Sequence, residues 1–178
     1  PGITYTHPKR FAAFLLNNYL GGGMSSSLFQ EIREKRGLAY NIYSSLAPFS
    51  DTGLFSVYVA TSHKEVDVCL DVIGREIEKL RSRPLEEKTL DILKENLKST
   101  ILLSSDSVEN RMTLIAKSEL FFKRYFSTLE ICTLIDRVTS KDMLLLARKL
   151  FNPNNLILIL MGRKPRQNIK AKLLKHLS

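Results

Sequence analysis

The sequence predicts an α+β fold, a two-layer domain in which helices pack on a mostly antiparallel sheet. Two strand-like segments, "LAYNIYSSLA" and "LFSVYVA", flank the turn sequence "PFSDTG", which is typical of an antiparallel hairpin. The segments with helical spacing of apolar residues are clustered instead of alternating with strands. The chain has 178 residues, of which 44% are hydrophobic, so we expect a single domain over residues 1–178 with a substantial core.

Two helices are expected before the hairpin. The first begins near Pro8, whose fixed φ suits the first turn of a helix, and ends at a run of three glycines. The second begins in the serines at 25–27, where Ser27 and Gln30 have the spacing of a capping box, and stops at Gly37 as a C-cap. The chain should therefore turn from a helix directly into a strand at Gly37.

The chain after the hairpin is mostly helical in pattern. Helices are expected from residue 62 to the region of Pro84, over residues 85–103 and over residues 108–124. Thr139 and Asp142 have capping-box spacing at the start of a later helix. The run "LILILM", residues 156–161, predicts a buried strand, and the basic segment after it predicts a closing helix.

The net charge of +9 is concentrated near the end of the sequence. The last sixteen residues contain six basic residues and no acid, which favours a solvated or domain-joining helix over a nucleic-acid surface. A nucleic-acid-binding module centred on residues 163–178 is the less favoured alternative. The six basic residues are Arg163, Lys164, Arg166, Lys170, Lys172 and Lys175.

The apolar runs and the cysteines carry little functional information. The longest apolar run, "LILILM", has the length of a strand, so we expect no membrane insertion. Cys69 and Cys132 lie in apolar helical patterns without a C-x-x-C motif, and we expect them to be packed side chains outside any disulfide. This use of cysteine favours a reducing compartment such as the cytoplasm.

No catalytic or metal-binding motif is visible. A catalytic zinc site needs three protein ligands, and His7, His63 and His176 match neither H-E-x-x-H nor H-x-x-E-H. We therefore expect no metal site and no catalytic residue in this chain.

The stretch "GGGMSSS" has two interpretations. It lacks the lysine of a phosphate-binding P-loop. Gly21, Gly22 and Gly23 form either a tight connection between two helices or a loop that lets a peptide or an anion approach closely. In the second case they are a candidate substrate loop.

Arg33 and Tyr40 lie on either side of the expected helix-to-strand corner. A structural interpretation places Arg33 in the last helical turn, where a cation complements the dipole, and Tyr40 in a strand packed under helices. In a functional interpretation, Gly37 fixes the two side chains relative to each other, and both donate hydrogen bonds to a peptide carbonyl or an oxyanion. The residues alone favour the structural interpretation.

The string "LGGGMSSSLFQEIREKRGLAYNIYSS" resembles the C-terminal-half domain of the pitrilysin or insulinase type of zinc metallopeptidases, most closely the mitochondrial-processing-peptidase-like branch. The resemblance continues in "DTGLFSVYVATS", "ENRM" and "VTSKDMLLLARKLF" and covers about residues 2–163. Ser27 stands where that family often has arginine, which is a local departure. The resemblance implies the α+β fold of one metallopeptidase half.

In that family, two homologous halves enclose a chamber. One half carries an inverted H-x-x-E-H zinc site, and the other contributes an arginine and a tyrosine that bind the substrate backbone; the matching positions here are Arg33 and Tyr40. The resemblance implies that this chain is the substrate-binding, zinc-free half of a zinc metalloendopeptidase. Its partners would be a peptide or protein substrate and a homologous half that binds the zinc, and the chain alone would be inactive.

The zinc half could be supplied in two ways. The sequence is one domain of a longer two-half peptidase chain, as its start at "PGI" indicates, or it acts with a separate zinc-bearing subunit. A different alternative is a non-catalytic structural subunit of the same fold, such as those of respiratory complexes. The presence of both Arg33 and Tyr40 favours the peptidase.

Overall fold

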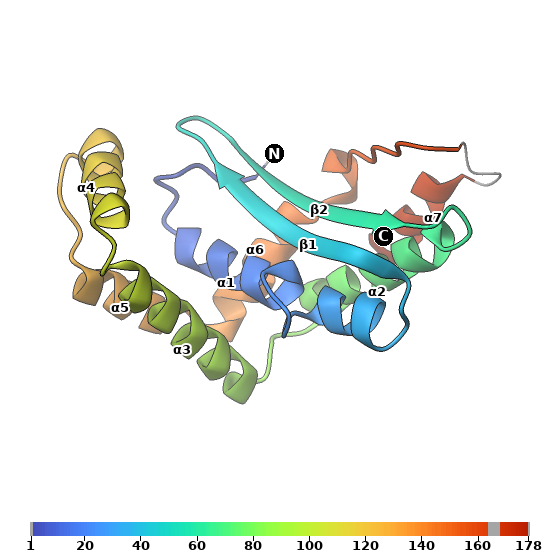
Figure 1. Cartoon of the computed structure of the whole chain (residues 1–178), viewed down its shortest axis with the longest axis horizontal. Helices are drawn as coiled ribbons and strands as arrows, with labels where there is room; N and C mark the ends of the chain where they lie inside the picture. The colour runs from blue at the N-terminus through green and yellow to red at the C-terminus, as the bar shows by residue number, and fades with distance from the viewer. Residues whose placement is uncertain (1, 164–167, 178) are drawn as a thin grey trace.

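Helices pack on one face of a two-stranded antiparallel sheet, which confirms the predicted α+β architecture (Figure 1). The computed structural model describes residues 2–163 and 168–177. The sheet is the predicted hairpin of β1 (Ala39–Pro48) and β2 (Gly53–Thr61). The helices are α1 (Arg10–Gly21), the short π-helix η1 (Phe29–Glu34), α2 (Val66–Ser82), α3 (Glu87–Ser104), α4 (Val108–Phe122), α5 (Thr128–Asp136), α6 (Ser140–Leu150), the 3₁₀ turn η2 (Pro153–Asn155) and α7 (Ile169–Leu177).

The hairpin has one face toward the helices and one toward solvent. Ile42 pairs with Val59, and both pack against the core beneath the sheet. Tyr43 pairs with Tyr58 on the outer face, where the ring centroids lie 5.1 Å apart in a stacked arrangement. Alternate residues of a strand point to opposite faces, so the apolar alternation read from the sequence sets which face is buried.

α1 is the central helix of the core. Leu15, Leu16 and Leu20 are fully buried, and the helix contacts β1, α3, α5 and α6. Its last residue, Gly21, lies against β1, where an added side-chain carbon would come 2.3 Å from the backbone nitrogen of Ser44. The close approach of helix and strand therefore requires a glycine at this position.

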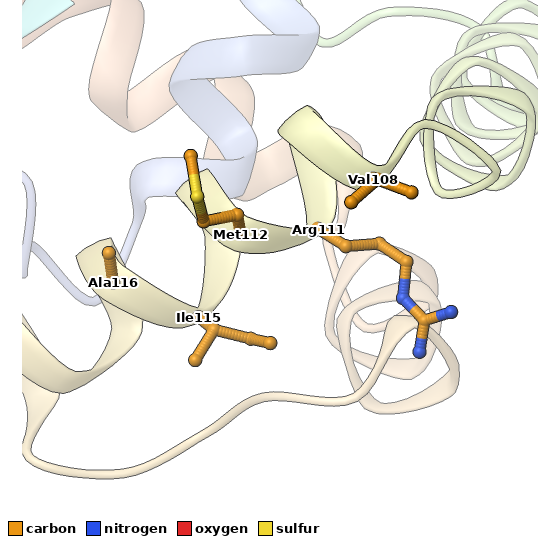
Figure 2. A pocket seen from close by; sticks show the side chains of 5 residues that line it. All are labelled: Val108, Arg111, Met112, Ile115 and Ala116. Carbon is orange, nitrogen blue, oxygen red and sulfur yellow. The ribbon is translucent and has the colours of Figure 1, made fainter.

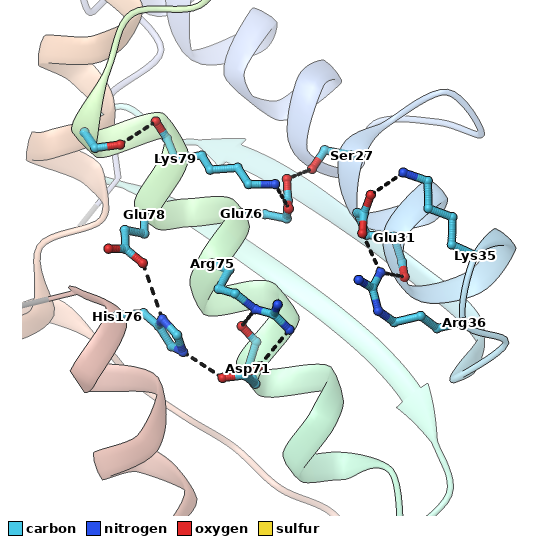
Figure 3. A network of polar contacts seen from close by, with 11 residues as sticks. Ser27, Glu31, Lys35, Arg36, Asp71, Arg75, Glu76, Glu78, Lys79 and His176 are labelled. Atoms are coloured by element: carbon cyan, nitrogen blue, oxygen red, sulfur yellow. Dashed lines mark hydrogen bonds and ion pairs between the residues drawn. The ribbon is translucent and has the colours of Figure 1, made fainter.

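The closing helix predicted from the basic segment is confirmed as α7, which packs on α2 (Figure 1). Polar contacts join the two helices. His176 Nε2 lies 2.8 Å from an Asp71 carboxylate oxygen (Figure 3). Arg81 also donates a hydrogen bond to the Leu177 carbonyl. The hydrogen bond from His176 lowers the pKa of Asp71. Two of the predicted basic residues, Lys164 and Arg166, lie outside the described residues.

One predicted capping box is confirmed and another is wrong. Thr139 and Asp142 exchange the reciprocal bonds of a capping box at the start of α6. Ser27 makes no such bond with Gln30, because its hydroxyl donates to the buried carboxylate of Glu76 on α2 (Figure 3). The Ser27 hydroxyl therefore bonds to an acid far away in the sequence and does not form the helix cap that the local spacing had predicted.

The prediction of a buried strand at residues 156–161 is wrong. The segment is extended, and its alternation places Leu156 and Leu158 against the core, but no strand within residues 2–163 and 168–177 pairs with it. Ile157 and Ile159 are each 80% exposed. A strand needs a hydrogen-bonding neighbour, and none of the described segments supplies one.

Two further expectations concern disulfide bonds and membrane-spanning helices. Cys69 is buried, Cys132 is partly buried, and both are free thiols. Among the described residues, no helix combines the length and the apolar character needed to cross a bilayer.

We expect Ser27→Ala to destabilise the fold. The change leaves one oxygen of Glu76, a residue that is only 4% exposed, without its hydroxyl donor, and an unpaired buried acceptor costs about 1–3 kcal/mol. Urea unfolding monitored by circular dichroism measures the loss. The control is Ser25→Ala, an exposed serine without a side-chain hydrogen bond among the described residues. Equal unfolding midpoints for the two variants would contradict the assignment.

Candidate functional site

The helix that carries Arg33 is wound more widely than an α-helix. Residues Phe29–Glu34 form a π-helix, and the Lys35 amide donates to the Gln30 carbonyl, five residues back, at 2.9 Å. Single π-turns are rare in proteins, and those that occur are often found at functional sites. The sequence pattern predicted an ordinary amphipathic helix here, because apolar spacing does not distinguish the two windings over so short a stretch.

Gly37 ends this helix, as predicted. Its φ is +61°, in the left-handed region, and nothing lies within 4 Å of where a side-chain carbon would be. The Gly37 amide donates to the Arg33 carbonyl at 3.0 Å, and the Leu38 amide donates to the Ile32 carbonyl at 2.9 Å. The glycine is therefore required by backbone conformation, and it turns the chain directly into β1.

Tyr40 sits at a bulge in the first residues of β1. Ala39 pairs with Thr61 and Asn41 pairs with Ala60, which leaves Tyr40 as the extra residue without a partner. Bulges re-aim side chains and occur next to active sites. Tyr40 is 83% exposed, so the interpretation that packs it under helices is wrong.

The structure brings Arg33 and Tyr40 into contact. The guanidinium carbon of Arg33 lies 4.7 Å from the centroid of the Tyr40 ring and 4.8 Å from that of Phe29. Both distances are within the range of cation–π attraction. Phe29 was missed in the sequence, although its spacing of four residues from Arg33 places the two on one helical face.

A separate network holds the basic end of the helix. The Glu31 carboxylate accepts from the Lys35 ammonium and from the Arg36 guanidinium, which also reaches the Glu31 carbonyl (Figure 3). These hydrogen bonds, first that from Lys35 and then that from Arg36, lower the pKa of Glu31 to about 2. Glu31 is thus paired with Lys35 and Arg36, and Arg33 has no acidic partner among the described residues.

This arrangement presents two unengaged donors side by side. Within the described residues, neither the Arg33 guanidinium nor the Tyr40 hydroxyl makes a side-chain hydrogen bond. Arginine offers a charged fork of N–H donors and tyrosine a neutral O–H donor. With the π-turn, the glycine and the bulge fixing their positions, the pair can bind a carbonyl oxygen or an oxyanion with little reorganisation.

The glycine run divides into parts with different surroundings. Gly21 is buried against β1, and an added side chain on Gly22 would contact Asn18 at 2.6 Å. Gly23 is exposed with nothing within 4 Å of an added side-chain carbon, and its carbonyl accepts from the Ser26 hydroxyl. Close packing thus accounts for the glycines at 21 and 22 but not for Gly23, and Gly22 and Gly23 remain exposed to solvent.

The residues present do not fit a metal centre. Within residues 2–163 and 168–177, no three His, Cys, Asp or Glu side chains gather where they could hold a metal ion. A hollow on α4 is lined by apolar side chains and one arginine, without an acid or a nucleophile (Figure 2). This hollow therefore adds no candidate catalytic group to the pair at the Gly37 corner.

Comparison with known proteins places the chain among peptidase domains. A family model described as the peptidase M16 inactive domain matches residues 1–97. An uncharacterized zinc protease of Streptomyces coelicolor is 36% identical over 148 residues, which cover 83% of this chain and 32% of that protein. The uncharacterized zinc protease YmxG of Bacillus subtilis is 32% identical over 150 residues, covering 84% of this chain and 37% of that protein.

The fold is also similar to that of a solved peptidase domain. The peptidase M16 inactive domain from Pseudomonas fluorescens superposes with a TM-score of 0.69 at 25% identity, over 81% of this chain and 34% of that one. The chain spans about one third of the length of the curated relatives that it matches.

We expect Gly37→Ala to destabilise the corner by about 1–2 kcal/mol, because a left-handed conformation is unfavourable for a residue with a side-chain carbon. Thermal or urea unfolding measures the change. The matched control is Gly23→Ala, where φ is not positive and the added methyl group meets open space. The control should leave stability unchanged or raise it slightly. If Gly37→Ala behaved like the control, the required left-handed turn would be disproved.

The Glu31 network should respond to acid. Its pKa in the folded protein, about 2, lies below the ordinary value of 4.5, so its stabilising contribution is full above pH 4.5 and is lost as the pH falls toward 2. An NMR titration of the Glu31 carboxyl carbon should give a midpoint near 2 in the folded protein. Lys35→Ala should raise that midpoint, whereas Lys64→Ala, at an exposed lysine elsewhere, should not. A wild-type midpoint near 4.5 would contradict the network.

Proposed function

From the premise that this chain belongs to the peptidase M16 family, as a domain of the inactive type, we propose that it is the substrate-binding half of a zinc-dependent metalloendopeptidase. The observation that carries the proposal is the contact between Arg33 and Tyr40, 4.7 Å from guanidinium carbon to ring centroid, with both donors unengaged by any described residue. Similarity to proteins called zinc proteases supports the reaction class.

The two side chains would act on the backbone of a bound peptide. The Tyr40 hydroxyl and the Arg33 fork would donate to a peptide carbonyl oxygen and hold it in one orientation. Because charge grows on that oxygen during hydrolysis, donors fixed in advance favour the transition state over the ground state. The rings of Phe29 and Tyr40 flank the guanidinium and limit the rotamers that binding would otherwise have to freeze.

Two of the three glycines of the candidate substrate loop, Gly22 and Gly23, belong to the same proposal. Gly22 and Gly23 are exposed and follow the end of α1, and backbone without side chains permits close approach of an extended peptide. Gly21 has a packing role against Ser44 and is left out of the proposed contact surface.

In this proposal, the zinc ion is bound by another part of the assembly. The described residues hold no cluster that fits zinc, so the ion and the glutamate general base would come from a homologous half. Since the matched region is about one third of each relative, that half could lie in the same polypeptide or in a separate subunit. This chain alone is then inactive.

Tyr40→Phe tests the role of the hydroxyl in the assembled enzyme. We expect kcat/KM for a peptide substrate to fall by about tenfold or more, since loss of one preorganised donor reduces turnover by up to ~10²–10³. The fold should be unaffected because Tyr40 is exposed. Tyr43→Phe is the matched control: it removes a hydroxyl from the same strand and retains the ring that stacks on Tyr58.

The results separate the candidate functions. Hydrolysis with equal kinetics in the wild type and in Tyr40→Phe would refute the role of the pair. Failure of the intact native assembly to cleave any peptide in a broad peptide library would favour the non-catalytic structural subunit instead.

A further inference from the structure

Basic side chains line a surface cavity of about 470 Å³ at the start of α1, away from the Arg33 and Tyr40 site. The end of α4 and the end of α5 form its other walls. Its charged side chains are Lys9, Arg10, Arg124, Arg137 and Asp142, so four cations face one acid. The cavity lies at the opposite end of α1 from the glycine run, and twelve helical residues span roughly 18 Å.

Two of these cations are already paired with acids. The Lys9 ammonium contacts the Asp142 carboxylate at 2.6 Å, and the Arg124 guanidinium contacts the Glu130 carboxylate at 2.5 Å. Within residues 2–163 and 168–177, Arg10 and Arg137 have no acidic partner. The cavity therefore has an excess of positive charge that the described part of the chain does not neutralise.

Aromatic rings hold Arg10 in the wall of the cavity. Its guanidinium carbon lies 4.6 Å from the centroid of Phe11, 4.7 Å from that of Phe122 and 5.4 Å from that of Phe126. The Arg124 guanidinium carbon lies 4.0 Å from the same Phe126 ring. Two like charges thus contact one ring; ring contacts position Arg10, and Arg124 is held by Glu130 as well as by the ring.

The charged form of Arg10 is disfavoured in the cavity by burial and by the neighbouring charge of Arg124. Burial lowers the pKa of Arg10; the nearby Tyr5 opposes that shift, and the charge of Arg124 adds to it. A partly desolvated cation beside a like charge is stabilised by any anion that enters between them. The N-terminal end of α1, which starts at the cavity, also favours an anion, whereas the C-terminal ends of α4 and α5 oppose one, so the side-chain cations carry the attraction.

We propose that this cavity is an oxyanion-binding site that takes a carboxylate or phosphate group, with Arg10 and Arg137, the two lining cations that have no acidic partner among the described residues, as its donors. A guanidinium binds two oxygens of such a group with parallel N–H donors. The rings of Phe11, Phe122 and Phe126 provide an apolar wall for the part of the ligand that carries the anion. The site is independent of the proposed peptide contact at Arg33 and Tyr40.

Isothermal titration calorimetry of the intact protein, as it is isolated, tests the site. Inorganic phosphate and acetate are titrated separately, with sodium chloride keeping the ionic strength constant. We expect saturable binding of at least one anion, weakened about tenfold or more by Arg10→Gln and by Arg137→Gln. Lys64→Gln removes the same charge from an exposed lysine outside the cavity and should leave the affinity within about twofold.

The two anions distinguish the sources of the ligand. Saturable binding of phosphate alone identifies a phosphate group, and binding of acetate with comparable affinity identifies a carboxylate. Heats that do not saturate for either anion, or equal weakening by Lys64→Gln and the arginine variants, would overturn the proposal. If Arg10→Gln does not fold, the exposed Arg137 decides the result, since its side chain lies on the surface.

Discussion

The end of α1 lies so close to β1 that only a glycine fits between them, since a side-chain carbon on Gly21 would come within 2.3 Å of the Ser44 amide nitrogen. This contact seats the central helix of the core beneath the hairpin, with Leu15, Leu16 and Leu20 fully buried. Three further helices, α3, α5 and α6, contact α1, so their positions depend on the same approach. The Ser44 hydroxyl reinforces it by donating to Asn17 of α1.

The candidate site follows from the same geometry. Once the end of α1 is fixed against β1, the chain between them has to return through a short helix and enter the strand within a few residues. A π-turn, a left-handed Gly37 and a bulge at Tyr40 together make that return. Each is a departure from regular structure, and together they turn Arg33 and Tyr40 toward each other. Local irregularity of this kind is expected where function, and not packing, selects the conformation.

Features that depend on near neighbours in the chain were readable from the sequence. The hairpin follows from alternation and turn residues, the stop at Gly37 from glycine's access to positive φ, and the Thr139 cap from a spacing of three residues. Pairing with distant residues was not readable. Ser27 bonds to Glu76, 49 positions away, and nothing in the local pattern of residues 156–161 reveals that no strand in the described part of the chain pairs with them.

The site was readable only in part. Gly37 indicated that Arg33 and Tyr40 would be held near each other, and family resemblance supplied a reason to choose them. The exposure of Tyr40 depends on the bulge, which shifts the strand alternation by one residue and leaves no trace in the apolar pattern. Phe29 could have been found from its spacing to Arg33, because an aromatic and a cation four residues apart on a helix lie on the same face.

The extended segment at residues 156–161 has a consequence for how this domain exists in solution. It is a six-residue apolar stretch with high strand propensity, no charge and no proline, and its Ile157, Ile159 and Met161 side chains are open to solvent. No strand in the described part of the chain pairs with its backbone, and unpaired backbone beside such side chains is a template for cross-β stacking of one molecule on another. Covering this stretch with another segment or molecule would remove that template, and until it is covered the domain is more exposed to aggregation and to capture by chaperones and proteases.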